Sequence, residues 1–591
     1  MSEWRAEPRH FLAASLNWRR FRKSLREDRA ALAIALFLVL VITAFLLVPI
    51  ARAIGSGFLV DGHFSGYWFH RVMSSPILTA ELGNTFLLAS VTTVVCLAIS
   101  LPLAVIRDRY QFWGGNLLAI LLLVPLILPP FVGAIAMKRF LGQFGMLNLI
   151  LDKIGIIDMA KSLPPDWLGS GFAGVVILQG LHLFPIFYLN IAAALANIDP
   201  SYRQAARNLG ASGWRTFLRV TFPLIRPGIF AGGTIVFIWS FTDIGTPAVI
   251  GYEHLTPVTI FKELSNAEVN PRTFSLVFIM LGASVGAYIA GKFLFGQSPA
   301  GEGGKATTSN ETVRLGRLGT LLSWLLFGSV IFLAILPHII VMIMAVSDYW
   351  VNSILPSSWT LRHLEFVIQS PDTIGSIFNS LQYASAATVI DILLGSLAAW
   401  VIVRSRVYGR VALDGLCMLP LAVPGLILAA GYIALTAPGT PLEAFGPTRN
   451  PLVILIVAYS IRRLPFVLRG VSAGLQQMPV SMEEAARNLG ASPAVTVLRI
   501  TIPLISANII AAAVLTFSFH MLEVSDSLIL AQTQDYYPIT KQIYRLATST
   551  GSPDATNQAA AMGVYGIVLL GTTMGIASLL LGRRLGMVFR A

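Results

Sequence analysis

The chain of 591 residues is 55% hydrophobic and only 12% charged, whereas a soluble domain keeps about a quarter of its residues charged. This composition excludes a soluble multidomain protein and predicts a protein built for lipid. The net charge of +13 does not indicate nucleic-acid binding, because no basic run is interleaved with aromatic residues on a soluble module. The two cysteines, Cys96 and Cys417, lie in apolar runs and indicate neither a disulfide framework nor a metal site.

Twelve stretches are long and apolar enough to form membrane-spanning helices, each of which needs about 20 residues. They lie near residues 30–54, 84–106, 115–137, 173–195, 227–251, 274–296, 318–346, 379–403, 411–435, 451–471, 506–531 and 560–583. The first run is too long for the apolar part of a signal peptide, so we expect it to be a span. The predicted fold is an all-α integral membrane protein with about 12 transmembrane helices.

Basic residues predict the orientation of these spans. Most Lys and Arg residues fall on one side of the membrane if the cytoplasmic segment 1–29 and the C-terminus are both inside. A Gly-, Ser- and Thr-rich stretch, 297–317, then forms a flexible cytoplasmic linker between a first half, 30–296, and a second half, 318–591. The external loop 138–172 fits this rule worst, because it carries Lys138, Arg139, Lys153 and Lys161.

The two halves repeat each other. The sequence AARNLGAS occurs at residues 205–212 and again at 485–492, an offset of 280. Nearer the start of each half, Asn84 corresponds to Asn379 at an offset of 295. A repeat of this size indicates duplication, and it predicts two six-helix halves related by a pseudo-two-fold axis.

Each copy of the repeated segment is expected to form a short cytoplasmic helix of about two turns. A capping box should open it and a left-handed glycine should close it, before a proline breaks the chain ahead of the next span. The capping pairs are Ser201 with Gln204 and Ser481 with Glu484, the glycines are Gly210 and Gly490, and the prolines are Pro223 and Pro503.

Small and apolar residues give these helices a face that another surface can approach closely. They are Ala205, Ala206 and Leu209 in the first copy and Ala485, Ala486 and Leu489 in the second. A loop that only covers the bundle has little reason to keep eight identical residues while the flanking spans diverge. We therefore interpret both segments as docking surfaces.

The second copy resembles a known motif. Glu484-Ala485-Ala486, followed by Gly490, Ile500 and Pro503, is similar to the "EAA" loop of binding-protein-dependent permeases of ATP-binding-cassette importers. The first copy departs from it, with Gln204 in place of the glutamate and Val220 and Phe222 at aliphatic positions. Two such loops in one twelve-span chain resemble the fused permeases of the ferric-iron, thiamine and phosphonate type.

This resemblance implies a permease subunit of the bacterial inner membrane without catalytic residues or a cofactor of its own. Two copies of a separate ATPase would bind ATP and Mg²⁺, and the two loops would be coupling helices seated in them. The implied coupling residues are Gln204, Ala205, Ala206, Leu209, Gly210, Glu484, Ala485, Ala486, Leu489 and Gly490. A periplasmic binding protein would deliver the substrate. Because Gln204 lacks the charge of Glu484, the two loops are expected to dock unequally.

Two acids at membrane depth are candidates for the translocation path. Asp243 and Glu523 correspond at the offset of 280, and each follows about 17 residues of a span. Such groups are costly in lipid and usually face a protein interior or a wet cavity. A facing pair would suit a cation; alternatively, the acids only cap a helix break near Gly245-Thr246-Pro247. Asp391, His182, His338 and His520 are expected to be satisfied polar residues rather than metal ligands.

The best-supported substrate is ferric iron, with 2-aminoethylphosphonate, another small phosphorylated anion, thiamine or a polyamine as alternatives. A twelve-span secondary transporter is the alternative of another class, but its mechanism needs no repeated cytoplasmic loop. An enzyme is disfavoured because no nucleophile, base and metal-ligand constellation is found. The linker sequence Gly301-Glu302-Gly303-Gly304-Lys305-Ala306 is no phosphate-binding loop, since it lacks the Ser or Thr after lysine.

Overall fold

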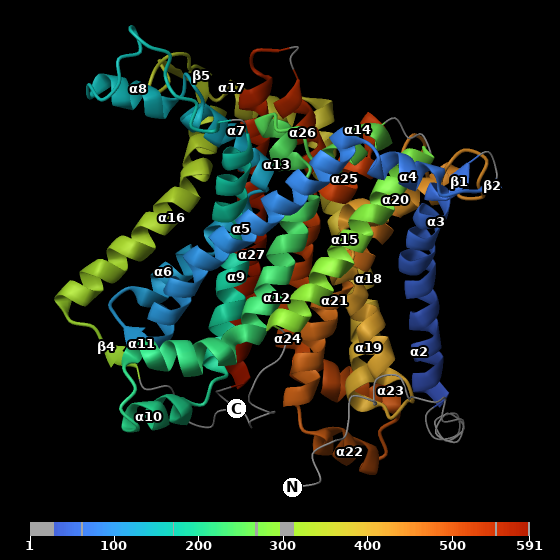
Figure 1. Cartoon of the computed structure of the whole chain (residues 1–591). Helices are drawn as coiled ribbons and strands as arrows, with labels where there is room; N and C mark the ends of the chain where they lie inside the picture. Colours follow the sequence, from blue (N-terminus) through green and yellow to red (C-terminus); the bar gives the residue numbers. More distant parts are fainter. Residues whose placement is uncertain are drawn as a thin grey trace.

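A computed structural model describes residues 29–60, 63–169, 171–265, 270–295, 312–549 and 552–588. The structure is a bundle of helices with three minute two-stranded sheets in its loops (Figure 1). The N-terminal segment before Arg29 and the linker residues 297–311 lie outside the described residues.

The first half contains the following elements: α2 (Arg29–Ile42), the π-helical turn η1 (Thr43–Leu47), α3 (Val48–Gly57), β1 (Leu59–Val60), β2 (His63–Phe64), α4 (Tyr67–Met73), α5 (Pro76–Arg109), β3 (Tyr110–Gln111), α6 (Gly115–Leu121), the 3-10 turn η2 (Val124–Ile127), α7 (Pro130–Leu141), α8 (Met146–Lys153), α9 (Phe172–Ala196), α10 (Pro200–Asn208), α11 (Gly213–Thr216), the π-helical turn η3 (Phe217–Thr221), α12 (Phe222–Thr242), α13 (Gly245–Ile250), α14 (Thr256–Leu264) and α15 (Pro271–Phe295).

The second half follows the same order: β4 (Val313–Arg314), α16 (Arg317–Ala345), β5 (Ser347–Tyr349), β6 (Ser358–Trp359), α17 (Arg362–Gln369), α18 (Pro371–Arg404), α19 (Arg410–Met418), η4 (Leu419–Leu421), α20 (Gly425–Leu435), η5 (Glu443–Phe445), α21 (Leu452–Gln477), α22 (Val480–Asn488), α23 (Pro493–Thr496), the π-helical turn η6 (Val497–Thr501), α24 (Ile502–Met521), α25 (Ser525–Leu530), η7 (Gln534–Tyr536), α26 (Ile539–Thr548) and α27 (Ala555–Val588).

All twelve predicted spans fall on helices, but not all are simple spans. Within the described ranges, eight continuous helices are long and apolar enough to cross a membrane, and two further pairs, α6–α8 and α19–α20, are bent by 95° at a break. The other two predicted spans correspond to α21 and α27. Helix α21 is 26 residues long but carries Arg462, Arg463 and Arg469, so it is less apolar than a simple span.

The proline breaks predicted at Pro223 and Pro503 are wrong. Gly213–Thr242 and Pro493–Met521 are continuous helices that contain these prolines. In each helix a π-helical turn ends two residues before the proline; in the first copy the amide of Phe222 bonds to the carbonyl of Phe217, five residues earlier. This wider turn lets the helix continue through a residue that has no N–H to donate.

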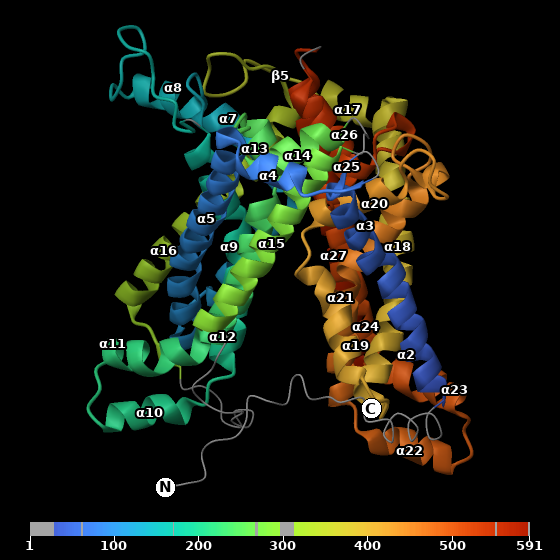
Figure 2. The ribbon, with the colours of Figure 1, turned by 45° about the vertical axis from the view of Figure 1, so that its right-hand side comes forward.

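The first helix of each half lies against the opposite half. The rod α2–α3 packs on α15 of its own half but also on α18, α19 and α20 of the second, and α16 packs on α27 and on α7 of the first. Figure 2 shows α2 and α3 among the helices of the second half, with α16 beside α5 and α9. The hydroxyl of Tyr432 on α20 donates to the carbonyl of Phe45, 2.7 Å away.

The last residues of the predicted linker form regular structure, because β4 (Val313–Arg314) pairs in parallel with β3.

The bundle has two distinct ends. Helices α10 and α22 lie at one end, together with the first residue of α2 and the last described residues of α27 (Figure 1). Strand β5 and helices α8, α17 and α26 lie at the opposite end (Figures 1 and 2).

Candidate functional site

The two repeated segments form the short helices α10 and α22. Gly210 and Gly490, with φ of 77° and 87°, follow them in the left-handed region, as predicted. In the first copy the amides of Gly210 and Ala211 bond to the carbonyls of Arg207 and Ala206, and the second copy repeats this pattern. These paired bonds satisfy the last carbonyl groups of each helix and turn the chain sharply.

The predicted capping boxes are wrong. Helix α10 begins at Pro200, so Ser201 already lies in its first turn and Asp199 is the cap, accepting from the Ser201 amide at 2.8 Å. This hydrogen bond lowers the pKa of Asp199. Helix α22 begins at Val480 after Pro479, and its cap position has no side-chain bond. The Asp-Pro pair at 199–200 was the available signal, since proline is favoured at the first helical position.

The leucines at the ends of α10 and α22 point into solvent. Leu209 is 88% exposed and Leu489 is 89% exposed, more than any other large apolar side chain that the structure describes. Leucines exposed in this way at equivalent places, on the same end of the bundle, are typical of a surface that a partner covers. The coupling role of these residues stays a prediction.

An ion pair ties each of these helices to the end of the long second helix of its half. Arg203 on α10 binds Asp108 on α5 at 2.7 Å, and Glu483 on α22 binds Arg404 on α18 at 3.3 Å. All four side chains are at most 12% exposed. Arg203 and Glu483 occupy equivalent positions, so the same link is made with opposite polarity in the two halves.

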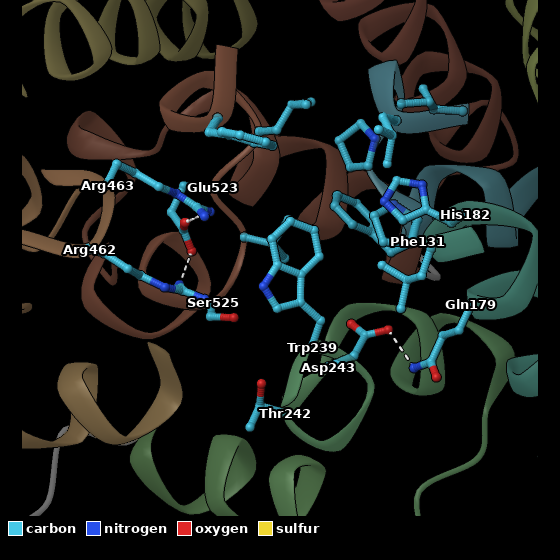
Figure 3. A pocket seen from close by; sticks show the side chains of 18 residues that line it. Phe131, Gln179, His182, Trp239, Thr242, Asp243, Arg462, Arg463, Glu523 and Ser525 are labelled. Carbon is cyan, nitrogen blue, oxygen red and sulfur yellow. Dashed lines mark hydrogen bonds and ion pairs between the residues drawn. The ribbon is translucent and has the colours of Figure 1, made fainter. Parts of the chain in front are cut away.

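A cavity of about 100 Å³ lies between the halves. It is lined by residues of α9 and α12 from the first half, by residues of α21 and the end of α24 from the second, and by the bend at Pro129 and Pro130. Asp243 and Glu523 both line it, each at the break between a span and a short helix. The structure therefore brings the two predicted acids to one cavity, but gives them different partners (Figure 3).

Asp243 is held by neutral groups. One carboxylate oxygen accepts from the side-chain amide of Gln179 at 3.0 Å, and the other accepts from the backbone amides of Gly245 and Thr246 at 3.0 and 3.4 Å. The backbone bonds cap α13, which agrees with the helix-break interpretation. Among the described residues no cation pairs with this carboxylate.

Glu523 is held by two arginines. Arg462 binds one of its oxygens at 2.5 Å and Arg463 binds the other at 2.7 Å, while Arg462 also reaches Asp526 at 3.3 Å. The guanidinium group of Arg463 lies 5.1 Å from the ring centre of Phe519. Figure 3 shows this cluster on one side of the cavity and the Asp243–Gln179 pair on the other, with Trp239 between them. These arginines are not among the residues predicted for the translocation path, although two adjacent arginines within an apolar run were a visible signal.

The family of the chain follows from a comparison with known proteins. Residues 97–295 and 391–587, more than half of the chain, match the model for the "Binding-protein-dependent transport system inner membrane component". The chain belongs to this family. It is a fused double permease, the membrane subunit of an ATP-binding-cassette importer.

Curated relatives of this permease span most of its length. The ferric transport system permease protein FbpB 1 of Haemophilus influenzae is 27% identical over 87% of this chain and 80% of its own. FbpB of Actinobacillus pleuropneumoniae is 27% identical over 85% of this chain and 72% of its own. Among solved structures, a chain of a bacterial ABC transporter for the import of alginate matches 48% of the permease and 100% of itself, with 16% identity and a TM-score of 0.40.

The two family matches exclude the first helix of each half, α2–α3 and α16, which lies against the opposite half and which we call the exchanged helix. The first begins within α5 and the second within α18, so α2–α3 and α16 lie before them. Each match thus contains helices that line the cavity together with one of the short helices α10 and α22.

A second polar cluster joins α18, α21 and α24. Asp391 and His520 form a fully buried pair, with 3.2 Å between Oδ2 and Nε2. The hydroxyl of Ser460 donates to Asp391 at 2.6 Å, and the hydroxyl of Thr388 is hydrogen-bonded to Nδ1 of His520 at 3.1 Å. Neither Asp391 nor His520 lines the cavity, whereas His182 does. Within the described ranges, no three His, Cys, Asp or Glu side chains are placed to hold a metal ion together.

Gly425 makes room for Arg462. A Cβ atom on Gly425 would lie 2.1 Å from Nη1 of Arg462, so Gly425→Ala is expected to push the guanidinium group away from Glu523 and Asp526. We expect a destabilisation of about 1–3 kcal/mol, as for other overpacked sites, measured as a lowered melting temperature in detergent. Gly415→Ala is the control, because nothing lies within 4 Å of its added Cβ. Equal melting temperatures for the two variants would contradict this assignment.

Proposed function

We propose that this permease conducts ferric iron from the periplasm to the cytoplasm. Two curated relatives that cover most of the chain are named as ferric transport permeases. The observation that carries the proposal is the charge of the cavity. The positive charges of Arg462 and Arg463 offset the negative charges of Glu523 and Asp526. The carboxylate of Asp243 is therefore the one negative charge at the cavity that no described cation offsets. A carboxylate is a hard oxygen ligand that attracts a cation, and this charge disfavours phosphonates and other anions.

The proposed energy source is a pair of separate ATPase subunits that bind ATP and Mg²⁺. Their docking sites are α10 and α22, which is supported by the exposed Leu209 and Leu489 and by the repeated glycine-terminated turns. Movement of the docked ATPases would reach the spans through the buried ion pairs on Arg203 and Glu483. A periplasmic binding protein would deliver iron to the opposite end.

The orientation follows from these docking sites. ATPases of importers work in the cytoplasm, so the end with α10 and α22 is cytoplasmic in the inner membrane. The first residue of α2 and the end of α27 lie at that same end. This agrees with the positive-inside rule, which places both termini in the cytoplasm.

The test is Asp243→Asn in proteoliposomes that contain the permease, its ATPase and the iron-loaded binding protein. The amide keeps the size of the side chain and an acceptor for the Gly245 amide, but it removes the charge. We expect iron uptake to fall at least about tenfold, which corresponds to about 1.4 kcal/mol. Stimulation of ATP hydrolysis by the loaded binding protein should persist, since the coupling segments are unchanged.

Asp414→Asn is the matched control, because Asp414 pairs with Arg469 away from the cavity. It should transport iron like the wild-type permease. If Asp243→Asn takes up iron at the wild-type rate, the cavity is not part of the translocation path. A binding protein that is stabilised against heat by 2-aminoethylphosphonate, thiamine or spermidine, and not by ferric iron, would overturn the proposed substrate.

A further inference from the structure

A second, larger cavity lies at the outer end of the permease. Its volume is about 660 Å³, and it lies between the halves, where α7 and α13 of the first half face the end of α16, strand β5, α17, α26 and α27 of the second. These elements lie at the end opposite α10 and α22 (Figures 1 and 2). The cavity is open to solvent beside Tyr349 and Val351, which are 61% and 51% exposed.

Two cations of this cavity have no ion-pair partner among the described residues. Arg362 is compensated, because it binds Asp348 at 3.0 Å and Asp554 at 2.9 Å. Lys138, in contrast, only donates to the carbonyl of Val249 at 3.4 Å, and the guanidinium group of Arg139 only lies over the ring of Trp350, 4.9 Å from its centre. Because Arg362 is shared by two carboxylates, the charged side chains of the lining sum to +1, and Lys138 and Arg139 are the cations that no carboxylate pairs with.

The fold does not require these cations. At the offset of 295, which aligns Pro129 with Pro424 at the two span bends, Lys138 and Arg139 correspond to Ile433 and Ala434. Both of these are buried apolar residues, 1% and 2% exposed. The same bent span is thus built without charge in the other half. Lys and Arg at the outer end also oppose the positive-inside rule, so their presence needs a reason beyond packing.

We propose that this cavity receives acidic side chains from one lobe of the binding protein and so determines which way round that protein docks. The inference rests on the proposed function, in which a binding protein delivers substrate to this end. A pseudo-symmetric permease presents two similar outer surfaces to a partner, and only a difference between them selects one orientation. Charge pairs at an interface fix register in this manner. The aromatic and arginine-rich lining, with Tyr349, Trp350 and Arg139, is typical of a protein interface.

The first experiment measures ATP hydrolysis by the complete transporter in nanodiscs against the concentration of loaded binding protein. For the double variant Lys138→Gln and Arg139→Gln, we expect the half-maximal concentration to rise about tenfold at low salt, and the difference to shrink as salt screens the charges. Lys161→Gln is the matched control, because it removes an outer cation that is 84% exposed and already paired with Asp158. It should match the wild-type permease.

The second experiment places a photo-crosslinking amino acid at Tyr349 or at Leu59, an exposed residue of β1 at the outer end of the other exchanged helix. We expect the Tyr349 position to label one lobe of the binding protein and the Leu59 position to label the other. Labelling of both lobes from Tyr349 in the wild-type permease would overturn the proposal.

Three further outcomes would also contradict the proposed docking role of this cavity. An unchanged half-maximal concentration in the double variant would contradict the proposal. A change that appears only in nanodiscs with anionic lipid, or only with added inorganic phosphate, would assign the cavity to a headgroup or a free anion instead. If no loaded binding protein stimulates the wild-type transporter, the proposed function fails, and this inference fails with it.

Discussion

Glu523→Gln is expected to destabilise the permease by about 3–5 kcal/mol, the usual result of removing one partner from a buried ion pair. Glu523 is 3% exposed and is the acceptor for both Arg462 and Arg463. A glutamine would keep one acceptor oxygen, but its amide group would face a guanidinium group, donor against donor. One buried positive charge would then be uncompensated. The measurement is the melting temperature in detergent, with expression level as a second readout.

Two comparisons isolate the cause of this effect. Glu443→Gln removes an acid from the exposed pair with Arg449, in which the side chains are 37% and 67% exposed, and it should leave the melting temperature close to that of the wild-type permease. Adding Arg463→Gln to Glu523→Gln removes the uncompensated charge, so the double variant should recover part of the loss. If the single and double variants melt alike, the ion pair does not hold this part of the bundle together.

Gly490→Val is expected to abolish transport while leaving the permease inserted in the membrane. At φ 87° a β-branched residue is strained by about 1–2 kcal/mol, and this strain acts at the turn that ends α22. Nothing lies within 4 Å of an added Cβ, so the effect comes from the backbone and not from a clash. The turn should reopen and displace Leu489 from the docking surface. The measurement is the amount of ATPase that co-purifies with the permease.

Gly439→Val provides a matched control for the same strain. Gly439 has φ 81° and equally open surroundings, but it lies in the loop after α20, a helix near the end opposite α22 (Figure 1). It should retain the ATPase at the wild-type level. Should Gly490→Val co-purify with its ATPase at that level and still transport, α22 would not be a coupling helix.

The sequence predicts those features of the fold that depend on local or repeated patterns. Apolar runs locate helices at all twelve predicted spans, and the exact repeat identifies α10 and α22 together with the glycines that end them. The starts of these short helices are predicted less well. The cap at Asp199 competes with an equally plausible one at Ser201, and proline at the first helical position decides between them.

Features that depend on packing between distant segments are not predictable in this way. In the sequence, Arg462 and Arg463 only make a predicted span less apolar. The structure shows that they bind Glu523 and Asp526, which come about 60 residues later in the chain. The ion pairs of Arg203 and Glu483 with the ends of α5 and α18 are equally unpredictable from the sequence, because the repeat places opposite charges at equivalent positions. Periodicity reports that a face is buried, but not which partner buries it.

The exchange of the first helices has a consequence for biosynthesis. The rod α2–α3 is synthesised before the other described spans, yet it packs closely on α20: a Cβ atom on Gly431 would lie 2.5 Å from the carbonyl oxygen of Pro49. The bond from Tyr432 to Phe45 joins residues 387 positions apart. At about 5–20 residues per second, a ribosome needs about 20–80 s to cover that distance. During this interval the side of the first span that packs on α20 lacks that partner, so the first half completes its packing only after the second half has been synthesised as far as α20.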